Sequence, residues 1–503
     1  MTALLAQLAP GNFRAPTLDF HALAPEIILL VTLVLLVLLD SIKLDRARAS
    51  MPAVANIGLL ASLIPLVTLA AAGGTRQLFG GSYVVDPMSL VLKALFIVTT
   101  YVVILLSTNY VAEGDYWESE YYTLLVSSLL GMVVMASSRD LIGIFVALEL
   151  LSIPAYMLAA WRKGDVRSNE AGMKYYLMGV FASAILLYGM SLVFGVGGST
   201  RLVEIGLRLR EIGTEGVPVV TLALVFVLIG FAFKVSAVPF HVWAPDTYEG
   251  APTPVTAFLA VASKAAGFVA LIQIVYFCFI VRPDIIQPVF FVLAVLSMTV
   301  GNLIALRQTN VIRMLAYSGI AQAGFMLAPF VVAGELPIQS RQAVVIYLVI
   351  YAAMNLGAFA VVIAIARKTG SAEIDSFGGL FQYMPGMAVA LTLFLASLIG
   401  IPPLGGWYAK FSVFKVLIEA ETGLGIATAI VMAINTAIAA YYYLRVARAM
   451  WFDDAPDGDT TPVRVPAGLT AAVTLALVAT LLFGVLPGLL SDLTSFQPLA
   501  LGG

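Results

Sequence analysis

The sequence is poor in the residues that bind metals and redox centres. It contains one cysteine, Cys278, and two histidines among 503 residues. One cysteine excludes an internal disulfide, a cysteine-based zinc site and a protein-held iron–sulfur cluster, which needs about four ligands. A GxGxxG motif after a strand and a GxxxxGK[ST] phosphate loop are also missing. We therefore expect this chain to bind no redox cofactor, nucleotide or metal.

Charge is equally scarce. Only 11% of the residues are charged and 61% are hydrophobic, whereas a soluble domain carries about 25% charged residues. The mean hydropathy of +0.99 predicts an all-α polytopic membrane protein. The N-terminal segment lacks the basic start and the cleavage site of a signal peptide, so we expect the first helix to be retained.

Apolar runs of about 20 residues predict about 14 transmembrane helices joined by short loops. The predicted spans are 24–42, 53–72, 87–109, 120–136, 140–161, 171–195, 218–245, 254–281, 285–306, 310–332, 341–366, 380–419, 424–451 and 466–490. The longest loop contains "RLVEIGLRLREIG" (201–213), whose amphipathic pattern fits either a short interfacial helix or a solvated turn.

Two predicted spans are interrupted. Span 7 (218–245) contains Pro239 and Pro245, and span 12 (380–419) is broken by "GIPPLGG". Spans 7 and 12 are each the fourth helix if spans 4–8 and 9–13 form two five-helix repeats. An odd number of helices inverts the second repeat, as in carriers with paired broken helices at mid-membrane. We expect one transmembrane domain divided as follows: spans 1–3 (1–118), the first repeat (119–282), the second repeat (283–452), and a loop with span 14 (453–503).

The distribution of Lys and Arg predicts the orientation. If the 42–52 loop is cytoplasmic, more Lys and Arg lie in or beside cytoplasmic loops than outer loops. The acidic 110–119 loop is then also cytoplasmic but adds nothing to this bias. An even number of spans places both termini on the outer side.

Four ionisable residues fall deep inside predicted spans: Glu149, Lys234, Lys264 and Lys410. Such a residue costs about 2.5–3.5 kcal/mol at the bilayer centre, which favours a functional role. Burial disfavours a charged lysine and a nearby carboxylate favours it, so a balanced lysine can exchange a proton. We expect the four to form a lateral proton relay. The structural alternative is a set of buried ion pairs that fix helix register.

For the other titratable residues, a structural role is at least as expected as a functional one. His241 follows the break of span 7, where it either relays protons or is a hydrogen-bonded structural residue. Lys93 and Lys415 lie nearer to span ends, and we expect their side chains to snorkel to the membrane surface. His21 precedes the first span and is expected to be inert. Hard cations prefer several oxygen ligands, so a mostly lysine set favours protons over sodium.

Three long segments resemble one known family. They are "FAFKVSAVPFHVWAPDTYEGAPTPVTAFLAVASKAAGF" (231–268), "LIGIPPLGGWYAKFSVF" (398–414) and "FVALELLSIPAYMLAA" (145–160). They are similar to the antiporter-like membrane subunits of respiratory complex I, the proton-translocating NADH–quinone oxidoreductase. The resemblance covers essentially the whole chain. Among the three paralogous subunit types, lysine at 264 and at 410 and the lack of a long C-terminal lateral helix resemble the N type.

The resemblance implies roles for individual residues. Glu149 resembles the glutamate that modulates the pump lysine, and Lys234 resembles that lysine. Lys264 resembles the central lysine and Lys410 the residue leading to the outer side, whereas His241 resembles the histidine of the PFH motif. The implied activity is proton pumping driven by electron transfer from NADH to quinone on other subunits, which would carry FMN and iron–sulfur clusters.

The resemblance also implies the setting of the chain. The implied partners are other membrane subunits, the lipid bilayer and protons, with no nucleic acid, in a bacterial inner membrane. One alternative is an Mrp-type cation/proton antiporter subunit without redox coupling, and another is a membrane scaffold without a proton path.

Overall fold

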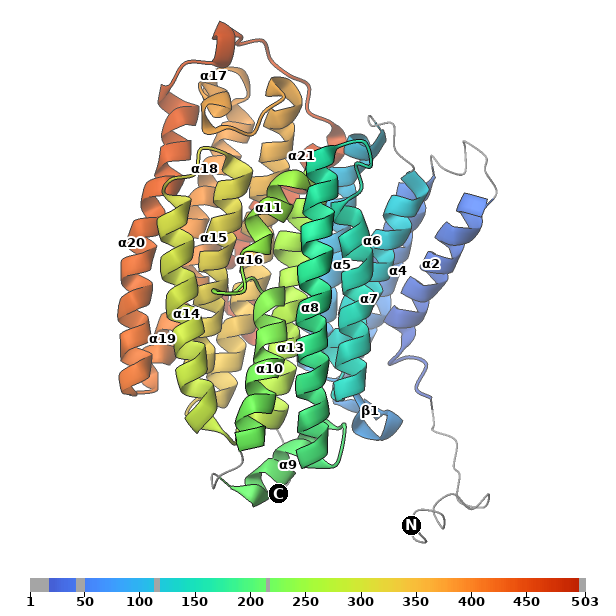
Figure 1. Cartoon of the computed structure of the whole chain (residues 1–503). Coiled ribbons are helices and arrows are strands. Elements are labelled where there is room, and N and C mark those ends of the chain that lie inside the picture. Colours follow the sequence, from blue (N-terminus) through green and yellow to red (C-terminus); the bar gives the residue numbers. More distant parts are fainter. Residues whose placement is uncertain (1–17, 42–49, 113–117, 214–217, 497–503) are drawn as a thin grey trace.

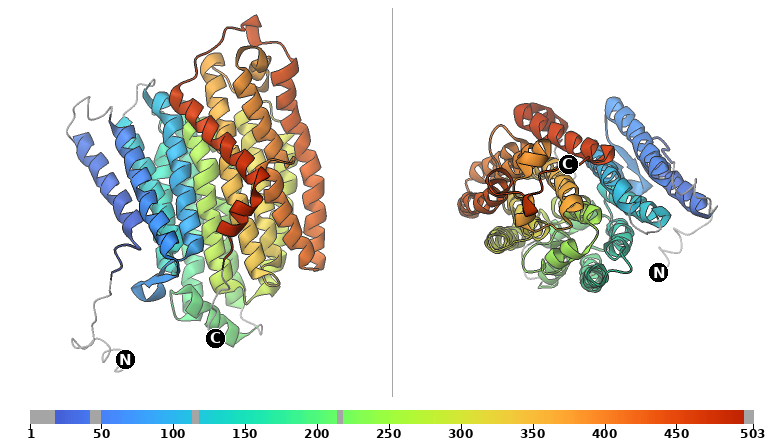
Figure 2. Two further views of the ribbon diagram at one scale, coloured as in Figure 1. Left: turned by 180° about the vertical axis from the view of Figure 1, so that it is seen from behind. Right: turned by 90° about the horizontal axis from the view of Figure 1, so that it is seen from above.

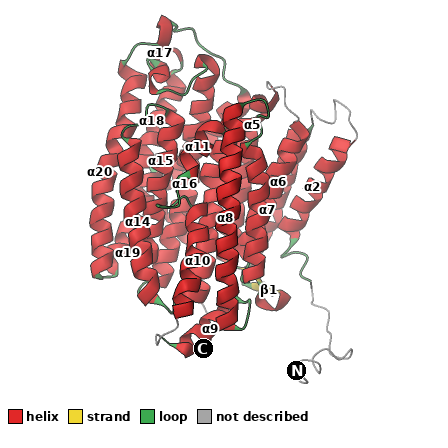
Figure 3. Cartoon of the chain, in the orientation of Figure 1, coloured by secondary structure: helices red, strands yellow, loops and turns green. Residues whose placement is uncertain are grey.

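The computed structural model describes residues 18–41, 50–112, 118–213 and 218–496. The predicted loop charges at 42–49 and 113–117 and both extreme termini lie outside these residues. The described chain is almost entirely helical, apart from one short hairpin of β1 (Arg76–Leu78) and β2 (Tyr83–Val85) (Figure 3). In the hairpin Gln77 pairs with Val84 in antiparallel register.

Most helices are long enough to cross a membrane. Among the described residues, twelve helices have the required length and hydropathy, and two shorter apolar helices begin the broken spans. The helices before the first break are α2 (Ala24–Ser41), α4 (Met51–Ala72), α5 (Pro87–Ala112), α6 (Glu118–Ser137), α7 (Leu141–Ala159) and α8 (Val166–Gly197). Those after it are the continuous run α12–η3 (Thr253–Phe279), α14 (Pro283–Ala305), α15–η4 (Val311–Val332), α16 (Pro337–Thr369), α20 (Gly423–Phe452) and α21 (Ala467–Val485). The predicted all-α polytopic membrane architecture is confirmed.

The helices stand side by side, with α20 at one edge of the bundle and α2 at the other (Figure 1). α21 instead runs obliquely across one face, and α22 (Pro487–Leu493) follows it (Figure 2). The bundle has two ends, named here after the short helices that mark them. The α9 end carries α9 (Leu202–Ile212) and the β-hairpin, and the α17 end carries α17 (Leu380–Tyr383).

The amphipathic segment after α8 is a helix. α9 buries Leu202, Ile205 and Leu209 on one side and exposes its charged residues on the other. Of the two interpretations of this loop, the short helix is confirmed, and its position at the membrane interface stays a prediction. The apolar side packs against the end of the α12–η3 run, which explains the spacing of its leucine and isoleucine residues.

The first broken span differs from the predicted range 218–245. α10 (Pro218–Lys234) ends at Lys234. The next helix, α11 (Trp243–Gly250), begins at Trp243 and continues beyond Pro245. Pro245 lies in the first turn of α11, where the missing N–H of proline costs little. The break is therefore confined to residues 235–242. α10 and α11 both pack against α8, so they are two halves of one crossing (Figure 1).

The second broken span consists of α18 (Pro385–Ile399) and α19 (Gly405–Glu419). Gly400, with a φ of +99°, ends α18, since glycine adopts this conformation without strain. Residues 380–383, predicted as the start of this span, form the separate helix α17. α10 starts at the α9 end and α18 starts at the α17 end, so the two broken spans run in opposite directions (Figure 1).

Candidate functional site

Lys234 is the last residue of α10 and is 3% exposed. Its Nζ donates to Ser152 Oγ at 2.8 Å and to the Tyr175 hydroxyl at 3.2 Å. Its aliphatic chain lies against Gly267, where an added Cβ would come within 3.1 Å of Lys234 Cγ. A position at a helix C-terminus favours the ammonium form, because the last carbonyls carry partial negative charge. Burial opposes that form.

Glu149 lies on α7, the helix that also carries Ser152, a hydrogen-bond partner of Lys234. The Glu149 carboxylate accepts a hydrogen bond of 2.6 Å from Ser183 Oγ, and in the described part of the chain it makes no direct ion pair with Lys234. Ser152 lies three residues further along α7, on the same side of the helix, and its Oγ accepts from Lys234.

The break next to Lys234 satisfies backbone groups through protein side chains. The Val238 N–H donates to Ser297 Oγ at 2.9 Å, and Trp243 Nε1–H donates to the Phe233 carbonyl at 3.0 Å. Irregular backbone at membrane depth is tolerated only where protein or water supplies such partners. The break is thus a defined structure that places Lys234 at a helix end.

Lys264 follows directly after η2 (Leu259–Ser263), which is one turn of π-helix. Such turns are rare and are frequent at functional sites. Lys264 is 1% exposed, and its Nζ donates to the Gly319 carbonyl of α15 at 2.7 Å. The absence of a side chain at Gly319 allows this contact, because an added Cβ would lie 3.1 Å from both Lys264 Nζ and the Tyr351 hydroxyl.

Lys410 reaches back across the second break. It is 5% exposed, and its Nζ donates to the Ile399 carbonyl at 2.8 Å. The Nζ also lies 4.5 Å from the centre of the Phe325 ring, within the range of a cation–π contact. Gly400 gives the lysine room, since a Cβ there would lie 3.0 Å from Lys410 Cδ.

Polar groups join the three lysines into one line. The Tyr175 hydroxyl, bonded to Lys234, lies beside Ser263, the residue before Lys264. On α15, Gly319, Gln322 and Phe325 occupy one side of the helix over about 9 Å. Gln322 Nε2 donates to the Leu398 carbonyl at 3.1 Å, adjacent to the carbonyl that Lys410 binds. Lys264 and Lys410 thus both contact α15, and Lys234 binds a tyrosine that lies beside the residue preceding Lys264.

His241 lies within the break between α10 and α11 and is partly buried. Its Nδ1 atom is buried and has no hydrogen-bond partner among the described residues. The next residue, Val242, is 61% exposed, so the histidine lies close to the bundle surface. Its role as a relay stays a prediction.

The prediction that Lys93 snorkels is wrong. Lys93 is completely buried and forms an ion pair of 2.7 Å with Glu26 of α2. The Tyr83 hydroxyl donates to Glu26 at 2.6 Å and accepts from Lys93 at 3.2 Å. Glu26 is the third residue of α2, and only tertiary packing places it against α5. Lys415, as expected, is exposed, and it pairs with Glu419 at 3.7 Å.

Several polar residues of the site were missed from the sequence, namely Ser152, Tyr175, Gln322 and Tyr351. The spacing of Ser152 from Glu149 was a usable signal, because residues three apart share a helix face. The others are single polar residues in apolar helices, and their significance depends on which helices meet. The described residues hold no group of three or more His, Cys, Asp or Glu arranged for a metal ion.

The fold and site define a class of helical membrane protein with two broken spans that meet a buried line of lysines. A family model described as "NADH:quinone oxidoreductase/Mrp antiporter, TM" matches residues 138–436. This match covers more than half of the chain, which therefore belongs to that family.

Individual relatives agree with the family. The NADH-quinone oxidoreductase subunit N of Moorella thermoacetica is 43% identical over 83% of this chain and 87% of its own length. A chain of respiratory complex I from Thermus thermophilus is 32% identical, with a TM-score of 0.77 over 94% of this chain and all of that one. A chain of the Mrp complex from Dietzia has a TM-score of 0.83 over 95% of this chain and 97% of that one. At 21% identity, this likeness concerns the fold alone.

Proposed function

We propose that this chain is a proton-translocating membrane-arm subunit of an NADH–quinone oxidoreductase. Electron transfer from NADH through FMN and iron–sulfur clusters to quinone takes place on other subunits. This chain contributes proton transfer through Glu149, Lys234, Lys264 and Lys410, with His241 at the break of the first broken span. The similarity to subunit N of several bacteria supports the assignment of the complex and its other membrane subunits as partners.

The observation that carries the proposal is the bonding of the three lysines. Each is buried, and each donates to neutral oxygens: Ser152 and Tyr175 for Lys234, the Gly319 carbonyl for Lys264, and the Ile399 carbonyl for Lys410. A permanently charged lysine inside a membrane requires a charged partner or water. Lysines bonded to neutral groups accommodate either protonation state, which a proton relay requires.

The relay is proposed to work by charge coupling. A proton arriving at Lys234 makes its amine cationic and strengthens its attraction to Glu149, and loss of the proton weakens it. The positive charge on one lysine lowers the proton affinity of the next, first Lys264 and then Lys410. The two broken spans are proposed to belong to inverted repeats at 119–282 and 283–452, between an N-terminal unit (1–118) and a C-terminal one (453–503). Their opposite directions support this division.

The proposed setting is the inner membrane of a bacterium. From the Lys and Arg bias we propose that the α17 end faces the cytoplasm, and that the α9 end and both termini face the outer side. The loop after α7, which contains Arg162 and Lys163, and the start of α15, which contains Arg313, belong to the α17 end and support this orientation.

The experiment that separates this function from an Mrp-type antiporter uses the purified complex in sealed vesicles. We expect the complex that contains this chain to retain FMN and iron. We also expect NADH with quinone to drive proton uptake into inverted vesicles without a sodium requirement. Isolation of the chain in a complex without flavin or iron, together with proton exchange that depends on sodium, would establish the antiporter instead.

A further inference from the structure

α11 is a short helix between two stretches of non-helical backbone (Figure 1). It has eight residues, the break at 235–242 precedes it, and Ala251 and Pro252 separate it from α12 (Thr253–Phe258). Helices shorter than about 12–15 residues are marginal in water without tertiary contacts. The position of α11 therefore depends on what its side chains bind on the neighbouring helices.

Charged side chains attach α11 to two other helices at the α17 end of the bundle. Nη1 of Arg313, on α15, lies 2.9 Å from Asp246 and 2.7 Å from Glu249 of α11. Nζ of Lys174, on α8, lies 2.7 Å from the other carboxylate oxygen of Asp246 and 2.7 Å from Glu170. Each of these five side chains is at least 31% exposed. Since exposed ion pairs contribute little to stability, we expect loss of one pair to shift α11 rather than to prevent assembly.

The first residue of α11, Trp243, lies against the Lys234 site. Its ring stacks on the Tyr175 ring, with centres 4.5 Å apart and planes inclined by 12°. Its Nε1–H donates to the carbonyl of Phe233, the residue before Lys234, at 3.0 Å. The Tyr175 hydroxyl in turn accepts from Lys234. Trp243 is 2% exposed, so a shift of α11 displaces the Tyr175 ring or the Phe233 carbonyl.

The ionic contacts and the stacked rings involve adjacent positions on the same two helices. On α8, Lys174 binds Asp246 and the next residue, Tyr175, stacks on Trp243. On α11, Trp243 and Asp246 are three residues apart, which is about 4.5 Å along the helix axis and on one side of it. With Arg313 as the contact to α15, these interactions determine both the height and the rotation of α11.

We propose that Arg313 and Asp246 are positioning residues for proton transfer at Lys234. Their ion pair holds α11 in place, and α11 in turn holds Trp243 against the Tyr175 ring, so that the Tyr175 hydroxyl meets the Lys234 amine. Neither charged residue touches that amine, and their effect reaches it through the two stacked rings. This inference rests on the proposed function, because it assigns the ion pair to the same proton step.

The test is a double-mutant cycle between Arg313 and Tyr175. The measured quantity is the number of protons pumped per NADH oxidised by the assembled complex in sealed vesicles. Arg313→Gln removes the cation, and Tyr175→Phe removes the hydroxyl but keeps the ring. We expect each single variant to lose part of the proton yield. The double variant should pump no less than Tyr175→Phe, because the hydroxyl that Arg313 positions is then already missing.

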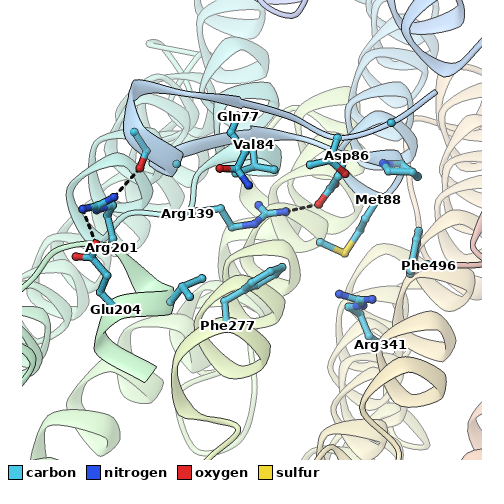
Figure 4. Close-up of a pocket in the computed structure, with 16 residues that line it drawn as sticks. Gln77, Val84, Asp86, Met88, Arg139, Arg201, Glu204, Phe277, Arg341 and Phe496 are labelled. Atoms are coloured by element: carbon cyan, nitrogen blue, oxygen red, sulfur yellow. Dashed lines mark hydrogen bonds and ion pairs between the residues drawn. The ribbon is translucent and has the colours of Figure 1, made fainter. Parts of the chain in front are cut away.

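Two further variants separate charge at this place from a general effect on the fold. One nitrogen makes both contacts of Arg313, so we expect the single cation of Arg313→Lys to restore the proton yield. Arg201→Gln is the matched control. Arg201 is a partly exposed arginine at the α9 end that also joins two segments, because it pairs with Glu204 and donates to the Gly80 carbonyl at 2.6 Å (Figure 4). We expect its proton yield to be unchanged.

Several results would overturn the proposal. They are an unchanged yield in Arg313→Gln or in Tyr175→Phe, additive losses in the double variant, and an equal loss in Arg313→Lys or Arg201→Gln. If Arg313→Gln prevents assembly, Asp246→Asn replaces it in the cycle, and failure of both to assemble also overturns the proposal. A lower yield in Lys234→Met with a normal yield in Arg313→Gln rejects the positioning role alone. An unchanged yield in Lys234→Met rejects the proposed function as well.

Discussion

Lys410 binds the backbone carbonyl of Ile399, the residue at which α18 ends. The last carbonyls of a helix have no partner within the helix, and a break inside a membrane must satisfy them by other means. Lys410 and Gln322 satisfy two consecutive ones, at Ile399 and Leu398. The break and the lysine thus form one structural unit, in which the polar C-terminal end of α18 holds the Lys410 amine.

The first prediction concerns Gln322, which connects α15 to this unit. Its Oε1 accepts from the Tyr347 hydroxyl at 2.5 Å, so Gln322→Leu leaves that hydroxyl and the Leu398 carbonyl without partners, at a cost of about 1–3 kcal/mol each. We expect proton pumping to fall several-fold. Gln273→Leu is the matched control, because Gln273 is a buried glutamine that binds the Ala136 carbonyl away from the lysine line. Equal pumping defects in the two variants would show that Gln322 acts only through stability.

The second prediction concerns the close approach at Gly319. In Gly319→Ala, the new methyl group would lie 3.1 Å from Lys264 Nζ, so the amine must move away from the Gly319 carbonyl. We expect the rate of NADH-driven proton pumping to fall while the complex still assembles. Gly386→Ala is the control, since an added Cβ there meets nothing within 4 Å. Normal pumping in Gly319→Ala would contradict a role of Lys264 in the relay that depends on its hydrogen bond to the Gly319 carbonyl.

The third prediction concerns the buried pair of Lys93 and Glu26. Lys93→Met leaves the Glu26 carboxylate buried without its cation, which costs about 3–5 kcal/mol. We expect a lower melting temperature of the purified complex, and partial recovery when Glu26→Gln is added. Lys415→Met should change little, because an exposed pair contributes about 0–1 kcal/mol. A double variant no more stable than Lys93→Met would contradict the electrostatic explanation.

The fourth prediction concerns pH and the start of α2. The hydrogen bond from Arg76 lowers the pKa of Asp19 below its ordinary value of 3.8. Asp19 therefore contributes stability that is present above pH 3.8 and is lost as the pH falls through its lower folded-state pKa. Its Oδ1 accepts from the amides of His21 and Ala22 at 3.1 Å, so these amides should lose protection from hydrogen exchange at acid pH, after correction for the intrinsic exchange rate.

Asp19→Asn provides the control for this pH effect. The amide oxygen still accepts hydrogen bonds but does not titrate over this range, so protection of His21 and Ala22 should become independent of pH between 5 and 3. The same acid-induced loss in Asp19→Asn would assign the effect to another group.

Much of the fold was predictable, because the hydropathy of consecutive residues along the chain determines which segments enter a membrane. The spans, both breaks and the buried positions of Lys234, Lys264 and Lys410 follow from apolar runs interrupted by proline, glycine or charge. The extent of the first break did not follow, because Pro245 is compatible with the first turn of a new helix. Proline marks where a helix cannot continue, but the same residue also begins helices.

The residues and main-chain atoms that contact the site lysines could not be predicted from the sequence. Lys93 looked like a surface residue because its distance from the helix end permits snorkelling, and its burial depends on Glu26, 67 positions earlier. The Gly319 and Ile399 carbonyls that bind Lys264 and Lys410 are main-chain atoms, which no residue pattern distinguishes. Such contacts arise from the packing of helices distant in the chain.

The most direct test of the central claim is the number of protons pumped per NADH oxidised by the Lys234→Met complex in sealed vesicles. Methionine matches the length of the lysine stem but cannot carry a proton, and Ser152 and Tyr175 remain in place around it. We predict an assembled complex that still oxidises NADH with a lower proton yield than the unmodified complex. An assembled Lys234→Met complex with an unchanged ratio of protons to NADH would contradict the assignment of Lys234 to the relay.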